Sequence, residues 1–193
     1  MYRACSTWQY EVLSHLVEHH YGGARLGYCS GDAYQATGQT GSRPGDSAFD
    51  AGWAVLKSHE GHPAFGLALR SRRAVAVYAY RDLRDVVFSL MYKRGESFLQ
   101  LLRQGMIHQI LANDRYWRSQ PGVLVQRYES MIAEPVIAVI QLARHIGLAI
   151  PRREAMAIAD EFSLESNRSR ILAIRAQLER AGIDLESPGN QQI

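Results

Sequence analysis

The chain has 193 residues, of which 47% are hydrophobic and 21% are charged, and its formal net charge is +3. These values are typical of one globular domain with a continuous core, and they exclude a disordered or fibrous protein. No apolar run is long enough to span a bilayer, and no signal-peptide pattern opens the sequence. Cys5 and Cys29 fit neither a metal-binding spacing nor a disulfide framework, so we expect a cytoplasmic protein.

The basic residues are almost all arginine. Lys57 and Lys93 are the only two lysines among 22 basic residues, so a lysine inside a motif is informative. Arginine suits bidentate recognition of phosphate and sulfate oxygens. The sequence lacks the basic helix or aromatic-interleaved patch of a dedicated nucleic-acid binder, and we expect no nucleic-acid partner.

The first predicted element is a helix over about residues 7–20, ended by Gly22. Ser6 and Thr7 occupy the expected N-cap position. A helix N-terminus with spare N–H donors, a partial positive charge and Arg3 nearby is suited to binding an anion. Trp8 would either stack on a ring beside this site or pack in the core. One apolar face is formed by Val12, Leu13, Leu16 and Val17.

Short strands and amphipathic helices then alternate along the chain. Residues 30–50, rich in Gly, Ser, Thr and Asp, are predicted to form a long loop. The predicted strands are 25–29, 54–56, 74–80 and 123–125, and the predicted helices are 63–72, 83–94, 97–119, 135–146, one from Pro151, and 164–181. Asp82 is the expected N-cap of the helix over residues 83–94. This alternation predicts a single α/β domain with a parallel β-sheet flanked by helices.

Several polar side chains follow the ends of the predicted strands. Lys57 and His59 follow one strand, Arg81 follows the next, and Tyr128 and Glu129 follow a third. In parallel sheets, ligands bind beyond the carboxyl ends of the strands. Each of these residues alone is weak evidence, but together they predict a ligand site at one edge of the sheet.

Four blocks in order resemble sulfotransferases that use 3′-phosphoadenosine-5′-phosphosulfate (PAPS). The stretch 3–8, Arg-Ala-Cys-Ser-Thr-Trp, resembles the family's 5′-phosphosulfate loop, and Lys57-Ser-His59 resembles its Lys-Thr-His. The stretch 80–89 resembles the 3′-phosphate block, in which a Ser follows an Arg by eight positions. Gln126 to Met131 resembles the later Tyr-Glu-Asp segment. The resemblance implies a P-loop-like α/β fold, similar to that of nucleotide kinases.

The resemblance also implies a role for each matching residue. His59 would take the proton of the acceptor, with Glu60 as a competing base, and Lys57 and Arg3 would stabilise charge at the transferring group. A sulfuryl group would move from PAPS to a hydroxyl or amine without a metal. The remaining PAPS contacts implied are Arg3, Ala4, Cys5, Ser6 and Thr7 at the 5′-phosphosulfate, Trp8 and Tyr128 at the base, and Arg81 and Ser89 at the 3′-phosphate.

The sequence departs from the family pattern at three places. A strand normally leads into the opening loop, whereas Arg3 is the third residue here, and the family's C-terminal Arg-Lys-Gly segment is absent. We therefore expect residues 1–193 to be one sulfotransferase-like domain without its lead strand and C-terminal lid. Cys5 replaces a glycine, which implies a changed turn or backbone strain.

Two alternatives remain open at this stage. One is a non-catalytic nucleotide-binding relative, which the retained Lys57 and His59 argue against. The other is a P-loop kinase, which would need Gly-x-x-x-x-Gly-Lys-Ser/Thr. The acceptor is a small molecule, a glycan or a peptide, and Tyr34, Phe49 and Trp53 would either line its pocket or belong to the core.

Overall fold

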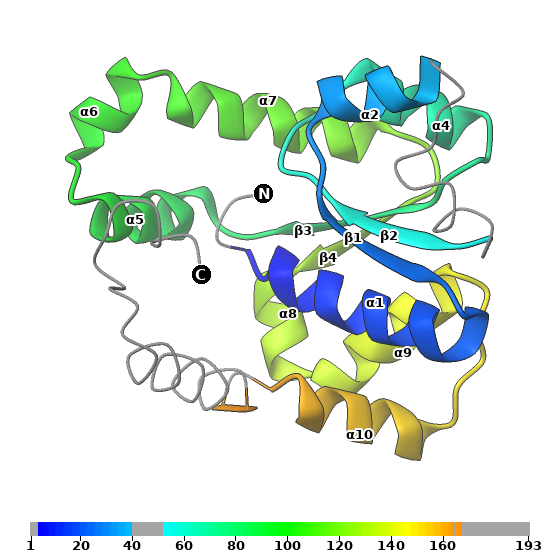
Figure 1. The fold of residues 1–193 in the computed structure, drawn as a ribbon. Coiled ribbons are helices and arrows are strands. Elements are labelled where there is room, and N and C mark those ends of the chain that lie inside the picture. Colours follow the sequence, from blue (N-terminus) through cyan, green and yellow to red (C-terminus); the bar gives the residue numbers. More distant parts are fainter. Residues whose placement is uncertain (1–3, 40–51, 164, 167–193) are drawn as a thin grey trace, which may run out of the picture.

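The computed structural model describes residues 4–39, 52–163 and 165–166, and it has an α/β architecture (Figure 1). The strands are β1 (Ala24–Tyr28), β2 (Ala54–Lys57), β3 (Ala76–Tyr80) and β4 (Val123–Arg127). The helices are α1 (Ser6–Tyr21), α2 (Gly31–Gln39), α4 (Pro63–Arg70), α5 (Leu83–Arg94), α6 (Phe98–Arg103), α7 (Met106–Ser119), α8 (Tyr128–Ala133), α9 (Pro135–His145) and α10 (Arg152–Glu161). The predicted α/β class with parallel strands is confirmed.

The strands form two parallel pairs rather than one continuous sheet. β1 pairs with β2 from Ala24–Ala54 to Tyr28–Lys57, with an irregularity beside Gly27. β3 pairs with β4 in unbroken register from Ala76–Val123 to Tyr80–Arg127. Within the described residues, β2 and β3 are not hydrogen-bonded to each other.

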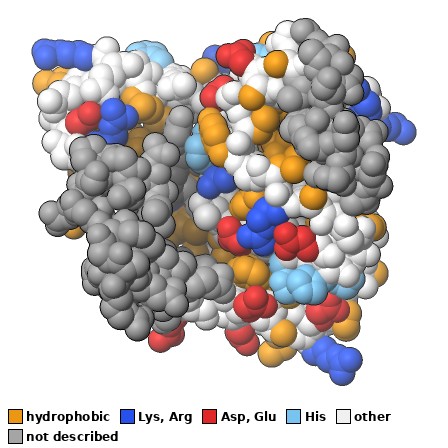
Figure 2. Space-filling model, viewed as in Figure 1, with side chains coloured by type: hydrophobic (Ala, Val, Ile, Leu, Met, Phe, Trp, Pro, Cys, Tyr) orange, Lys and Arg blue, Asp and Glu red, His pale blue; other side chains and the backbone are white. Residues whose placement is uncertain are grey.

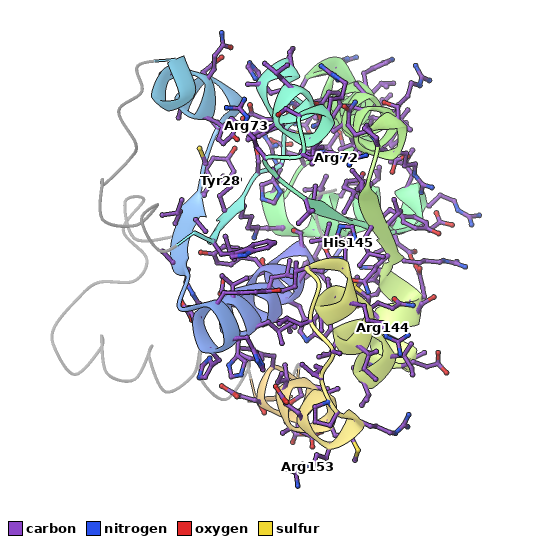
Figure 3. All side chains as sticks on the ribbon, turned by 90° about the vertical axis from the view of Figure 1, so that its right-hand side faces the viewer. Tyr28, Arg72, Arg73, Arg144, His145 and Arg153 are labelled. Atoms are coloured by element: carbon purple, nitrogen blue, oxygen red, sulfur yellow. The ribbon has the colours of Figure 1, made fainter. Side chains whose placement is uncertain are left out.

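Helices cover the strands on both sides. In the view of Figure 3, α2, α4 and α7 lie above the strands and α1, α9 and α10 lie below them. Successive residues of β3 show the same arrangement, since Val77 packs on the core of α1, α9 and α10 whereas Tyr78 belongs to the core of α5, α6 and α7. Strands that are covered on both faces have continuous apolar sequences, and this is why residues 74–80 could be predicted as a buried strand.

Helix α1 agrees closely with its prediction. Its four predicted apolar positions are all buried: Val12, Leu13, Leu16 and Val17. Gly22, in the left-handed conformation at φ 59°, ends the helix and donates its N–H to the carbonyl of Val17. The helix packs against β1, β2 and β3 and against α9, so it contacts both strand pairs.

The predicted loop over residues 30–50 is wrong in its first part, because α2 forms there. The Ser30 hydroxyl accepts the Ala33 N–H at 3.2 Å and thus caps the helix. Tyr34 lies against Phe65 with ring centroids 4.9 Å apart, which attaches α2 to α4. Tyr34 is half-buried, and together with Trp53 it also lines a cavity of about 300 Å³, so the choice between pocket lining and core stays a prediction for both residues. Phe49 lies outside the described residues.

Two further helix predictions need correction. The predicted helix 97–119 is interrupted at Gly105, whose φ of 72° breaks the helical path and separates α6 from α7. No helix is predicted directly after β4, but α8 begins at Tyr128. The predicted helix 164–181 lies almost entirely outside the described residues.

Surface charge on the face drawn in Figure 2 is arranged as neighbouring acidic and basic groups rather than as one broad basic area. Arg25 is an example, because its guanidinium contacts Glu11 at 2.5 Å and Glu18 at 3.2 Å. None of the helices in the described part of the chain is both long and apolar enough to cross a membrane.

The burial of α1 generates a stability prediction. Leu16 is fully buried in the core of α1, α9 and α10, so Leu16→Ala should lower the free energy of unfolding by about 2–5 kcal/mol. Leu67→Ala is the matched control, because Leu67 is 56% exposed, and it should cost less than about 0.5 kcal/mol. Denaturant unfolding measures both, and equal losses would contradict the placement of α1.

Candidate functional site

The carboxyl ends of the two strand pairs meet at the N-terminus of α1. Lys57 is the last residue of β2, and its ammonium donates a hydrogen bond to the Thr7 hydroxyl at 2.7 Å. Arg81 follows β3, and its charge acts on the Cys5 thiol. The predicted convergence of Lys57 and Arg81 with residues 4–8 at one edge is therefore present.

The N-terminus of α1 is built differently from the prediction. Cys5, at φ 60° and ψ 22°, is the N-cap residue, so Ser6 and Thr7 are the first two helical residues and the predicted N-cap assignment is wrong. No side-chain hydrogen bond caps this end of the helix. The N–H donors of its first turn are thus not used by a cap, and the 16-residue helix adds a partial positive charge there.

Cys5 adopts the left-handed conformation that favours glycine. A non-glycine residue there carries about 1–2 kcal/mol of strain, as the Gly-to-Cys replacement implied. Burial raises the pKa of the Cys5 thiol, and the nearby Arg81 charge partly offsets this rise. The neighbouring Ala4 is fully buried, whereas Arg3 lies outside the described residues.

A second cationic position lies at the end of the other strand pair. The Arg81 guanidinium stands over the Tyr128 ring at 4.3 Å from its centroid, and it also contacts Asp85 at 3.4 Å. Because β4 ends at Arg127, Tyr128 is brought directly beside the end of β3. Ser89 is half-buried on α5, two helical turns beyond Arg81.

Asp82 fixes the start of the helix that carries Ser89. Its carboxylate accepts the Arg84 N–H at 2.9 Å, as an N-cap should. The Arg84 guanidinium also contacts this carboxylate at 2.7 Å, and together these hydrogen bonds lower the pKa of Asp82 to about 2. The predicted N-cap role of Asp82 is confirmed.

Trp8 is partly buried and packs against both hydrophobic cores. Its position at the first turn of α1 couples the helix N-terminus to the packing of both strand pairs. The core interpretation of Trp8 is thus supported by its contacts. Stacking of Trp8 on an adenine ring stays a prediction.

Lys57 and His59 share a partly buried environment after β2. Burial lowers the pKa of the Lys57 ammonium. Burial, and secondarily the charge of Lys57, lower the pKa of His59 to about 4. His59 is therefore neutral near pH 7, but a pKa this far below the operating pH makes its imidazole a weaker base than one that titrates near neutrality.

Tyr28 is a contributor that the sequence analysis missed. It ends β1 at the same edge (Figure 3). Its ring lies 5.8 Å from the His59 ring, centroid to centroid. Its hydroxyl donates to the Glu60 carboxylate at 3.1 Å. Tyr28 lies at the end of a predicted strand, as Lys57 and Arg81 do. This position was the one signal in the sequence that could have marked Tyr28 as a site residue.

The described residues thus combine two cations, helix N–H donors, an aromatic face and a neutral imidazole at one edge. Lys57 and the α1 terminus form one cationic position, and Arg81 with Tyr128 forms another. Such an edge can bind a ligand with two anionic groups and can accept a proton nearby.

Comparisons with known proteins support the fold. No protein-family profile and no curated protein sequence matches the chain. Among solved structures, the crystal structure of mouse sulfotransferase SULT7A1 complexed with PAP is similar, with a TM-score of 0.52 and 14% sequence identity. The match covers 85% of this chain and 73% of the mouse chain. At this identity the similarity concerns the fold.

The environment of His59 generates a titration prediction. Because burial and Lys57 lower its pKa to about 4, the His59 imidazole should stay neutral from pH 8 down to about pH 5. Lys57→Met should raise this pKa toward the ordinary value of about 6.5. Histidine chemical shifts followed by NMR measure both, and a wild-type pKa at or above 6.5 would contradict the described burial.

Proposed function

We propose that this protein is a PAPS-dependent sulfotransferase that moves a sulfuryl group to a hydroxyl or amine acceptor. The observation that carries the proposal is the meeting of Lys57, Arg81 and the α1 N-terminus at one edge of the fold. The fold similarity to a mouse sulfotransferase complexed with PAP supports it. So do the sequence blocks around Lys57, His59 and Arg81.

The charges at this edge fit a nucleotide with two separate anionic groups. Lys57 and the first turn of α1 would hold the 5′-phosphosulfate. Arg81, with Ser89 on the following helix, would hold the 3′-phosphate, and Tyr128 offers a ring face beside it. Charge-assisted hydrogen bonds of this kind are among the stronger polar contacts in proteins.

The same residues supply the catalysis that sulfuryl transfer needs. PAPS provides a sulfuryl group attached to a phosphate leaving group. As that bond breaks, Lys57 and the α1 N–H groups stabilise the negative charge on the leaving oxygen. His59, neutral at pH 7, accepts the proton from the acceptor hydroxyl or amine as its oxygen or nitrogen bonds to sulfur. The acceptor is a small molecule, a glycan or a peptide.

The nucleotide site is tested by calorimetric titration of adenosine 3′,5′-bisphosphate into the purified chain. We expect binding that Arg81→Ala weakens at least about tenfold, because a charge-assisted contact to the 3′-phosphate is lost. Arg84→Ala is the matched control, since Arg84 is 85% exposed and pairs with Asp82, and it should leave the affinity unchanged. AMP, which lacks the 3′-phosphate, should bind weakly, and its affinity should be the same for the wild type and for Arg81→Ala. Equal affinity of the wild type for both nucleotides would contradict the assigned role of Arg81.

The catalytic role of His59 is tested by turnover with labelled PAPS and a panel of phenol, alcohol and amine acceptors. His59→Asn should lower turnover at least about 100-fold, because proton transfer to a side chain contributes 10²–10⁴-fold to rates. Its affinity for adenosine 3′,5′-bisphosphate should stay unchanged. Glu60→Gln should keep most activity. Loss of turnover in Glu60→Gln alone would move the base to Glu60, and wild-type binding without any turnover would indicate a non-catalytic relative.

A further inference from the structure

Three glutamine side chains are joined by hydrogen bonds that run into the core. Gln9 Nε2 donates to Gln126 Oε1 at 2.9 Å, and Gln126 Nε2 donates to Gln141 Oε1 at 2.9 Å. Gln126 Nε2 also donates to the Ala138 carbonyl at 3.2 Å. These contacts join α1, β4 and α9, which are far apart in the sequence. We name the three residues the glutamine chain.

The link between Gln9 and Gln126 lies where polar side chains are rare. Gln9 is 2% exposed and Gln126 is 4% exposed, and the only other buried polar side chain among the described residues is Ser14. Burying an amide costs free energy unless its hydrogen bonds are satisfied. Gln126 meets this condition, because both its amide nitrogen and its amide oxygen have partners. The link is thus a directional contact in a largely apolar core.

Gln9 belongs to the first turn of α1. Its backbone N–H donates to the Cys5 carbonyl at 3.1 Å and closes that turn. Its side chain holds the same turn on Gln126 of β4. Gln126 lies two residues before Tyr128, and the Arg81 guanidinium stands over the Tyr128 ring. The glutamine chain therefore connects the two cationic positions of the candidate site, the α1 N-terminus and the position of Arg81 with Tyr128.

The separation of two anion positions matters most to a ligand that must reach both. A ligand with two anionic groups gains its second contact only if the separation of the positions fits the ligand. Hydrogen bonds depend on direction as well as distance, so a buried amide pair fixes one orientation of the first turn of α1 relative to β4. Apolar side chains of similar size would fill the same space without fixing that orientation.

We propose that Gln9 and Gln126 are positioning residues that set the separation of the two anion positions and thereby select a nucleotide with two anionic groups over nucleotides with one. This inference rests on the proposed function. The two glutamines act through other groups: Gln9 acts through the N–H donors of the first turn of α1, and Gln126 acts through the end of β4 and Tyr128.

The test compares three probes by calorimetric titration: adenosine 3′,5′-bisphosphate, AMP and adenosine 3′-phosphate. Gln126→Met removes the amide but keeps the side-chain length, and it should weaken binding of the bisphosphate at least about tenfold, because one of two anionic contacts is misplaced. Binding of each monophosphate should stay within about twofold, because each needs only one anion position. Gln109→Met is the matched control, since Gln109 is exposed on α7, and it should change all three affinities by less than about twofold.

A double variant separates positioning from stability. Gln126→Met leaves the buried Gln9 amide without this partner and should lower Tm by about 4 °C or more. Gln9→Met combined with Gln126→Met removes both amides, so Tm should return to within about 2 °C of the wild type. The affinity for the bisphosphate should still be at least about tenfold weaker, because the directional contact is missing. Recovery of both Tm and affinity would overturn the proposal, and so would an equal loss of affinity for all three nucleotides.

Hydrogen exchange gives a readout that needs no nucleotide. The Gln9 backbone N–H closes the first turn of α1, so in Gln126→Met it should exchange at least about tenfold faster than in the wild type or in Gln109→Met. Equal exchange in the three proteins would overturn the proposal. A wild-type chain that binds none of the three nucleotides would contradict the proposed function, whereas the exchange of Gln9 supports or overturns the fixed first turn by itself.

Discussion

Helix α1 packs across both strand pairs and holds them together. β2 and β3 do not pair with each other in the described chain, but α1 contacts both of them. Its buried face, with Leu16 and Val17 in the core of α9 and α10, fixes the helix against one side of the strands. The N-terminus of α1 is thereby held where both pairs end, and the candidate site exists because of this placement.

Much of the fold was predictable because hydrophobic periodicity is a local property of the sequence. The α1 stripe, the apolar run of β3 and the Asp82 cap each depend on neighbouring residues alone. The errors arose where a distant contact or a single backbone angle decides the structure. The contact of Tyr34 with Phe65 attaches α2, and the positive φ of Gly105 divides α6 from α7. The division of the strands into two pairs likewise depends on non-local pairing.

The site was predictable in its residues but not in its geometry. Lys57 and Arg81 were recognisable because they follow strands, and parallel strands bring their carboxyl ends to one edge. The sequence could not show that Cys5 would take the N-cap position, because a left-handed non-glycine residue is stabilised only by its surroundings. Nor could it show the depressed pKa of His59, which results from burial in the folded chain.

In the proposed site, one nucleotide would bridge the ends of both strand pairs at the α1 terminus. Hydrogen exchange with and without saturating adenosine 3′,5′-bisphosphate would detect this bridging, since a bound ligand slows exchange in the segments that it contacts. A bridging nucleotide should protect three segments that are far apart in the sequence at the same time: residues 5–9, 57–60 and 81–89. Protection confined to one strand pair, or lying elsewhere in the chain, would contradict it.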